Sequence, residues 1–261
     1  MNPLCLTIAG IDNCAAAGIY NDLKTFHHLG CYGTAAITTI TVQTIQNVIK
    51  IEPVKDSLLE EQLSAIFFSF KVNAIKTGMI YKKSHYKIIK KYLINIDIPI
   101  VIDPIIKSTS GTSFLETSAI NQLLELFSLA SLVTPNIPEA LFLLNRYQEP
   151  NSLNDLKKLS YDFFNEFRVP ILLKGGHFSK NDYLFDVFFD GEEFFILKTK
   201  KIDKKHIRGT GCTLSAAIIT FLAKKYPLKT AIHYAKKYIV SQIKKATPYK
   251  PYSDYYLILH E

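Results

Sequence analysis

Short apolar segments alternate with amphipathic segments along most of this chain, and this alternation limits the possible folds more than any other feature. Short apolar runs are typical of buried strands, whereas apolar residues at every third or fourth position are typical of helices. The predicted strands cover residues 4–9, 34–42, 74–77, 98–102, 131–134 and 171–173. The predicted helices run from Ile19 to a stop at Gly30 and over residues 57–70, 83–93, 117–127, 138–144, 153–167, 212–223 and 228–246. This order favours an α/β fold with a mostly parallel sheet covered on both faces.

One pair of predicted strands breaks the alternation. Residues 183–189 and 194–198 flank Asp190-Gly191, a dipeptide that favours a tight turn between antiparallel strands. We therefore expect an antiparallel hairpin at one edge of the sheet. The 261 residues contain no linker rich in Pro, Gly or Ser and no internal repeat, so we expect residues 1–261 to form a single domain.

The composition excludes several classes of protein. A hydrophobic fraction of 48% and a charged fraction of 21% are close to globular averages, so the chain is not mostly disordered. The longest apolar stretch, residues 214–223, is shorter than the roughly 20 residues that a membrane-spanning helix needs. The N-terminus also lacks the basic opening of a secretory signal. We therefore expect a soluble, cytoplasmic protein with no membrane partner.

The net charge of +8 has two interpretations. A basic surface can bind nucleic acid or a membrane, but it can also consist of solvated lysines on helices and loops. The lysines are scattered and no nucleic-acid recognition motif accompanies them, so we favour the second interpretation and expect no nucleic-acid partner. An anionic substrate such as a nucleotide would still benefit from the positive field.

The polar residues that follow the predicted strands are the candidates for a functional site, because open parallel sheets bind ligands beyond the carboxyl ends of their strands. The most informative motif is Gly209-Thr210-Gly211-Cys212-Thr213-Leu214-Ser215 at the start of a helix. Its glycines let backbone N–H groups converge, and the helix N-terminus adds positive charge, so residues 209–212 can form an anion hole. A thiolate is favoured in the first turn of a helix, so we expect a lowered pKa for Cys212. A flexible turn with a buried cysteine explains the spacing equally well.

Acidic and basic groups follow three other strands. Asp103 and Glu139 can hold Mg²⁺ or its waters, although Glu139 fits equally well as a helix-capping residue. Lys174, in Lys174-Gly175-Gly176-His177, is a candidate phosphate partner, whereas His177 is more typical of a turn. The chain has no GxxxxGK[ST] loop, and the four cysteines form no CxxC pair, which argues against structural zinc.

Two polar side chains lie near the front of the chain. Asp22 follows the loop 10–18, and Gln43 ends the second predicted strand. A carboxylate and an amide that face one pocket can recognise the donors and acceptors of a small polar heterocycle. Taken alone, Asp22 fits a surface pair on a helix and Gln43 fits an amide at the end of a strand.

Taken together, these motifs resemble the ribokinase-like superfamily, and within it the hydroxymethylpyrimidine/phosphomethylpyrimidine kinases of thiamine biosynthesis. The resembling segments, in chain order, are LTIAGID, AAAGIYNDLKTFHHLGCYGTAAITTITVQT, IKTGMI, VIDPIIKSTSG, LVTPNIPEA, ILLKGGHF and RGTGCTLSAAI. Each segment is weak alone, but the ordered set is specific and spans about residues 4–223. The resemblance implies a three-layer sandwich and a homodimer. It also implies ATP- and Mg²⁺-dependent phosphorylation of 4-amino-5-hydroxymethyl-2-methylpyrimidine and then of its monophosphate.

The resemblance also assigns roles to individual residues. The implied substrate-binding residues are Gly10, Asp22, Gln43 and Met79. The implied catalytic residues are Lys174, Gly209, Thr210, Gly211 and Cys212, with Cys212 either taking the hydroxyl proton or orienting the substrate. The implied ATP-binding residues are Asn136, Lys174 and Arg208, and the implied Mg²⁺ ligands are Asp103 and Glu139.

The sequence departs from the family pattern in its first loop. Relatives usually have Gly-Ser/Thr-Asp-Pro-Ser-Gly-Gly-Ala-Gly, whereas this chain has Gly10-Ile11-Asp12-Asn13-Cys14-Ala15-Ala16-Ala17-Gly18. Alanine resists a positive φ and its methyl group fills space, so we expect an altered pocket that affects the second phosphorylation most. Arg208 replaces a histidine and can add a phosphate contact, and the tail after Thr247 lacks a Gly-His-Gly found in many relatives.

Three alternative functions remain open. A pyridoxal or pyridoxine kinase can share the Gly-Thr-Gly-Cys loop, although Gln43 favours the pyrimidine. A sugar kinase is disfavoured because Cys212 stands where sugar kinases have an aspartate base. A non-catalytic pyrimidine-binding protein would fit the altered first loop, but the intact Gly209–Cys212 loop argues against it.

Overall fold

A mixed sheet forms the centre of this computed structural model, which describes residues 2–107, 111–176, 178–180, 182–204, 206–249 and 252–260. The strand order within these residues is β10-β9-β7-β6-β5-β4-β1-β2-β3, and β8 pairs with β9. The strands are β1 (Leu4–Asp12), β2 (Tyr32–Gln43), β3 (Val48–Pro53), β4 (Ala74–Thr77), β5 (Ile100–Ile102), β6 (Leu132–Val133), β7 (Ile171–Leu173), β8 (Ser179–Lys180), β9 (Tyr183–Phe189) and β10 (Phe194–Lys200). Strands β2, β1, β4, β5, β6 and β7 are parallel, as predicted.

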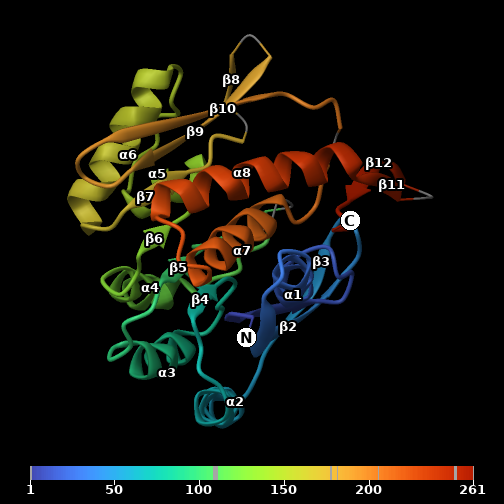
Figure 1. Cartoon of the computed structure of the whole chain (residues 1–261), viewed down its shortest axis with the longest axis vertical. Coiled ribbons are helices and arrows are strands. Elements are labelled where there is room, and N and C mark those ends of the chain that lie inside the picture. The colour runs from blue at the N-terminus through green and yellow to red at the C-terminus, as the bar shows by residue number, and fades with distance from the viewer. Residues whose placement is uncertain are drawn as a thin grey trace.

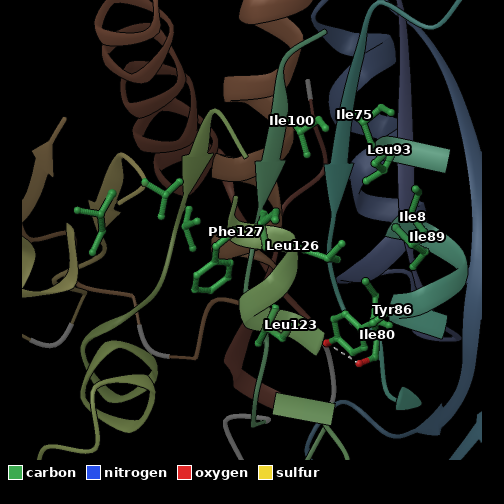
Figure 2. Packing of buried hydrophobic residues seen from close by; sticks show 14 of the residues in the cluster. Ile8, Ile75, Ile80, Tyr86, Ile89, Leu93, Ile100, Leu123, Leu126 and Phe127 are labelled. Atoms are coloured by element: carbon green, nitrogen blue, oxygen red, sulfur yellow. Dashed lines mark hydrogen bonds between the residues drawn. The ribbon is translucent and has the colours of Figure 1, made fainter. Parts of the chain in front are cut away.

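Helices cover both faces of this sheet and make three layers (Figure 1). One face carries α1 (Gly18–His28), α7 (Thr210–Ala223) and α8 (Leu228–Lys245). The other carries α2 (Asp56–Ser69), α3 (Lys83–Leu93), α4 (Ile120–Phe127), α5 (Ile137–Leu143) and α6 (Leu153–Phe167). Alternate residues of β1 enter the two cores: Leu6 and Ile8 pack toward α2–α6, and Cys5 packs toward α7 and α8. Figure 2 shows the first of these cores, including Ile8, Ile75 and Phe127.

The predicted elements are confirmed with small shifts at their ends, and the predicted hairpin is β9–β10. Residues 117–119 form a 3₁₀ turn before α4 rather than the start of an α-helix. Sequence analysis missed β3, which pairs antiparallel with β2 and gives the sheet a second antiparallel edge. It also missed the hairpin of β11 (Thr247–Tyr249) and β12 (Tyr252–Leu257). These strands are short, and the residues of β3 and β11 are partly or fully exposed. Their hydrophobic pattern is therefore weak.

The parallel strands end at one edge of the sheet and bring the candidate residues together. Strand β1 ends at Asp12 and β2 at Gln43, while Asp103 and Lys174 directly follow β5 and β7. The N-terminus of α7 lies over the same edge, since α7 packs on β1, β4 and β5. None of the helices in the described ranges is long and apolar enough to cross a membrane.

Candidate active site

The loop Gly209–Cys212 is held between two other parts of the site. Gly209 precedes α7 with φ 78°, and a methyl group at this position would overlap the carbonyl oxygen of Ala16 in the first loop. A methyl group at Gly211 would lie 3.5 Å from Lys174 Nζ. Gly209 therefore allows the close approach to the first loop, whereas a side chain at Gly211 would make only an ordinary contact with Lys174, and the N-terminus of α7 faces this ammonium group.

Asp103 and Lys174 form an ion pair beneath this loop. Lys174 Nζ donates to Asp103 Oδ1 at 2.8 Å, and the two side chains are 15% and 1% exposed. Ser215 in α7 donates to Asp103 Oδ2 at 3.1 Å, and Thr134 donates to Oδ1 at 3.2 Å. Burial alone would raise the pKa of Asp103, but the ammonium groups of Lys174 and Lys76 outweigh it and hold that pKa below its usual range. Asp103 is therefore a charged anchor that orients Lys174.

Asn136 and Glu139 form a capping box at the start of α5. The Glu139 N–H donates to Asn136 Oδ1 at 2.8 Å, and the Asn136 N–H donates to Glu139 Oε2 at 2.7 Å. The helix-capping interpretation of Glu139 is thus confirmed. Burial raises the pKa of Glu139 to about 7, and the Asp103 carboxylate adds to this rise. The Lys174 ammonium acts in the opposite direction but is outweighed.

The two carboxylates Asp103 and Glu139 fit a magnesium ion that keeps most of its water. Mg²⁺ in nucleotide sites usually has only one or two carboxylate partners and completes its shell with water and phosphate oxygens. Asp103 and Glu139 are close enough for each to affect the other's charge, and no group of three or more His, Cys, Asp or Glu in the described ranges can hold a metal by itself. His177 and residues 108–110 of the VIDPIIKSTSG segment lie outside the described residues.

The predicted low pKa of Cys212 is wrong. The side chain is 7% exposed, and burial raises the pKa of its thiol to about 11. The Lys76 ammonium pulls this pKa down, but the carboxylates of Asp22 and Asp103 push it up. Desolvation of the thiolate therefore outweighs the Lys76 ammonium, and this pKa favours a protonated thiol at pH 7.

Asp22 lies in the protein core, which does not fit the predicted contact with a substrate. Asp22 Oδ2 accepts from Lys76 Nζ at 2.7 Å and from the Thr7 hydroxyl at 2.7 Å, and both charged side chains are fully buried. Burial would lower the pKa of Lys76, but the Asp22 carboxylate outweighs burial and raises it. Both members of the pair act on Cys212: the Lys76 ammonium lowers the pKa of its thiol, and the Asp22 carboxylate raises it.

Gly10, Met79 and Gln43 lie at the other end of the site. A methyl group on Gly10 would approach Met79 Sδ to 3.3 Å, so these two residues are neighbours as predicted. Gln43 is 7% exposed, and its Oε1 accepts from Arg208 at 3.0 Å while its Nε2 donates to Thr41 at 3.1 Å. Arg208 was expected to bind ATP; instead it contacts Gln43 and the carbonyl oxygen of Ile45, at 2.9 Å.

Asp12 shapes the first loop. Its carboxylate oxygens accept from the N–H groups of Cys14 at 2.8 Å and Ala17 at 3.0 Å, and they lie 3.9 Å from Arg208. Ala15 has φ 53°, so alanine occupies the left-handed region here, although its side chain resists that conformation. A cavity of about 430 Å³ opens beside this loop, lined by Asn13, Cys14, Ile45, Tyr249 and Leu257.

The sequence matches the family model described as phosphomethylpyrimidine kinase over residues 12–254. This chain belongs to that family. A hydroxymethylpyrimidine/phosphomethylpyrimidine kinase from Aquifex aeolicus is 36% identical over 248 residues, which cover 93% of this chain and 95% of the relative.

Solved structures agree with the fold of this kinase. The pyridoxal kinase from Staphylococcus aureus in complex with AMP-PCP has a TM-score of 0.89 and 29% identity, over 100% of this chain and 94% of that chain. The phosphomethylpyrimidine kinase from Clostridium difficile 630 has a TM-score of 0.79 and 31% identity, over 93% and 100% of the two chains. The predicted ribokinase-like fold is therefore confirmed.

Sequence reasoning missed several residues that build the site of this kinase. Lys76 had one available signal, because a lysine inside the apolar strand 74–77 needs a buried partner in a sheet covered on both faces. Asn21 and His260 carry no comparable signal, since their partners lie far away in the sequence.

Proposed function

We propose that this kinase transfers the γ-phosphoryl group of ATP first to the hydroxymethyl group of 4-amino-5-hydroxymethyl-2-methylpyrimidine and then to the resulting monophosphate. The observation that carries this proposal is the position of Lys174, which pairs with Asp103 and lies against Gly211 at the start of α7. A cation beside a glycine-rich helix N-terminus is suited to a phosphoryl group in transfer. The Aquifex aeolicus relative is a hydroxymethylpyrimidine/phosphomethylpyrimidine kinase, which supports the pyrimidine substrate.

In this proposal the protein works mainly by positioning and by charge, since phosphoryl transfer needs little covalent assistance. The N–H groups of residues 209–212 would surround the transferring phosphoryl group, and Lys174 would contact the ATP phosphates. Asp103 would keep Lys174 in place from below. Asp103 and Glu139 would hold Mg²⁺ through its waters, and the ion would supply charge neutralisation on the phosphates.

Cys212 would orient the acceptor hydroxyl as a neutral thiol. A thiol with a pKa of about 11 is almost entirely protonated at pH 7, so it donates a hydrogen bond rather than taking a proton. The substrate's hydroxyl proton would leave late, to a phosphate oxygen or to water, as a loose transition state allows.

The acceptor heterocycle would lie between Gly10, Met79 and Gln43. Arg208 would serve this acceptor end rather than ATP, because its guanidinium holds the Gln43 amide and lies one residue before Gly209. Asn136 would not contact the nucleotide itself. Its side chain caps α5, so it would contribute only by fixing the start of that helix.

A pyridoxal kinase activity is the second candidate. The specific observation in its favour is the TM-score of 0.89 with the Staphylococcus aureus pyridoxal kinase, which is higher than the 0.79 for the Clostridium difficile pyrimidine kinase. Fold similarity alone does not fix a substrate, and the sequence match favours the pyrimidine.

The experiment that tests the proposal is a turnover assay with Mg-ATP and three separate acceptors: the hydroxymethylpyrimidine, its monophosphate and pyridoxal. Product masses identify each phosphorylated compound directly. We expect both pyrimidines to react and pyridoxal to react more slowly. Turnover of pyridoxal alone would promote the second candidate, and pyrimidine binding without any turnover would support a non-catalytic protein.

We also propose that the chain forms a homodimer through the exposed face of β2 and β3 and acts in the cytoplasm. Ile40, Val42 and Ile49 on these strands are 47%, 44% and 67% exposed. Apolar residues grouped at a sheet edge are typical of an interface. Sedimentation velocity should show a dimer for the parent protein and a monomer for Val42→Glu. A monomeric parent, or a Val42→Glu variant that stays dimeric, would contradict the proposed dimer.

A further inference from the structure

The C-terminal segment of this kinase lies against the residues that precede the anion-hole loop. The Arg208 N–H donates to the Tyr256 carbonyl at 3.2 Å, and the Tyr256 N–H donates to the His206 carbonyl at 3.4 Å. Ile207 and Tyr256 form a parallel bridge between these segments. Strand β12 therefore fixes the backbone of 206–208, directly before Gly209.

The same segment reaches the loop a second time through side chains. His260 Nε2 lies 2.8 Å from Asn21 Oδ1, and its Nδ1 lies 3.0 Å from the Tyr238 hydroxyl. Asn21, in α1, donates from Nδ2 to the Gly209 carbonyl at 3.3 Å and to the Thr213 hydroxyl at 2.8 Å. Asn21, Thr213 and His260 are 1%, 0% and 8% exposed, so water does not replace these bonds freely.

The direction of each bond follows from its partners. The Gly209 carbonyl can only accept, so the amide nitrogen of Asn21 faces it and the amide oxygen faces His260. His260 Nε2 must then carry the proton, and Nδ1 accepts from the Tyr238 hydroxyl. Burial lowers the pKa of His260 to about 4, with Lys24 and His28 adding to the shift, so the ring is neutral at pH 7 and Nδ1 accepts rather than donates.

The network fixes one particular turn of helix. The Gly209 carbonyl and the Thr213 side chain lie at the two ends of the first turn of α7, and that turn presents the N–H groups of Thr210, Gly211 and Cys212. His260 itself has φ 60°, a conformation that side chains rarely adopt and that persists where surrounding contacts impose it.

We propose that residues 254–260 hold the anion-hole loop in its working shape, with His260 as a positioning residue that acts through Asn21 on Gly209 and Thr213. The proposal rests on the proposed kinase activity for its kinetic consequence. It gives the tail a role in the reaction, although His260 reaches Gly209 only through Asn21.

The test compares His260→Ala, His260→Gln and the control Leu259→Ala, whose side chain is 50% exposed. Loss of the Nε2–H should let the loop shift and lower kcat about tenfold, because small displacements of positioning groups have large kinetic effects. The KM values for ATP and the pyrimidine should stay within about twofold. Glutamine can present an N–H close to the histidine Nε2 position, so His260→Gln should recover most of the rate, and Leu259→Ala should match the parent.

Amide hydrogen exchange gives a readout that does not need turnover. We expect His260→Ala to speed exchange in the first turn of α7 while the rest of α7 and α8 stays protected. If His260→Ala does not fold, Tyr238→Phe, which only removes the donor to Nδ1, should show the same local effect more weakly.

Three results would overturn the inference: an unchanged kcat, equal losses in kcat and affinity, or faster exchange throughout α7 and α8. If the parent phosphorylates neither pyrimidine, the proposed function fails. The exchange measurement would still decide whether the tail holds the loop.

Discussion

Two loops touch in the candidate site, and each contains a residue with positive φ. In the anion-hole loop that residue is Gly209 at φ 78°, whereas in the first loop Ala15 at φ 53° joins Gly18 at φ 61°. At these φ values glycine has no steric penalty and alanine does. Gly209 and Ala15 therefore meet a similar backbone requirement with different residues.

The surroundings explain why the two residues differ. A methyl group at Gly209 would overlap the backbone of Ala16, which has no rotamer through which to move away. The first loop is instead fixed by the Asp12 carboxylate, which accepts from Cys14 and Ala17. Close backbone packing makes glycine a requirement, whereas side-chain hydrogen bonds let a loop bear the moderate cost of alanine.

Gly209→Ala should have the largest effect. Its methyl group would push the start of α7 away from the first loop, and the N–H groups of the anion hole would lose their common direction. We expect kcat to fall about a hundredfold or more, measured with the hydroxymethylpyrimidine as acceptor.

Gly30→Ala is the matched control, because Gly30 also has positive φ, at 75°, but only the flexible end of Lys224 lies near its missing methyl group. That variant should lose about 1 kcal/mol of stability and keep its kcat. Equal activity of the two variants would show that the contact with Ala16 does not make glycine necessary at position 209.

Cys212→Ala should have the next largest effect, on turnover more than on pyrimidine affinity. Removing the thiol leaves the acceptor hydroxyl unoriented, and we expect kcat to fall about thirtyfold, with Cys212→Ser retaining more activity than alanine.

The pH profile of the parent enzyme distinguishes a Cys212 that acts as a base from one that only orients the hydroxyl. A base with pKa about 11 would raise kcat about tenfold per pH unit between pH 7 and 9, since its active, deprotonated form becomes more abundant as pH rises. An orienting thiol stays protonated over this range, so we expect a change of less than about threefold.

Asp12→Asn tests what holds the first loop. Asparagine replaces one acceptor oxygen by an NH₂ group that faces a backbone N–H, so one buried hydrogen bond to a charged group is lost. We expect a loss of about 2 kcal/mol in the free energy of unfolding and a raised KM for the pyrimidine. Asp97→Asn, at an exposed position, is the control and should change neither. A stable Asp12→Asn variant with normal KM would mean that packing alone holds this loop.

The sequence predicted the location of the site better than the state of its groups. Residues that end parallel strands, such as Asp103 and Lys174, must meet at one sheet edge, so their proximity follows from topology. The raised pKa of Cys212 could not be predicted, because the burial of its thiol and the positions of Lys76, Asp22 and Asp103 around it appear only in the packed structure. The contact between Arg208 and Gln43 could not be predicted for a similar reason, since the two residues are 165 positions apart in the chain.

Ala15→Gly should have the smallest effect, and it should be a gain. Glycine removes the steric cost of alanine at φ 53° but adds chain entropy to the unfolded state, so we expect a net stabilisation of at most about 1 kcal/mol. Ala16 has no positive φ and its methyl group is buried, so Ala16→Gly should cost about 0.8 kcal/mol instead. Removing the Ala15 methyl group also widens the loop, so the monophosphate should gain rate relative to the unphosphorylated pyrimidine. Thermal unfolding and the ratio of the two turnover rates measure both effects, and a less stable Ala15→Gly variant would show that the alanine conformation carries no strain.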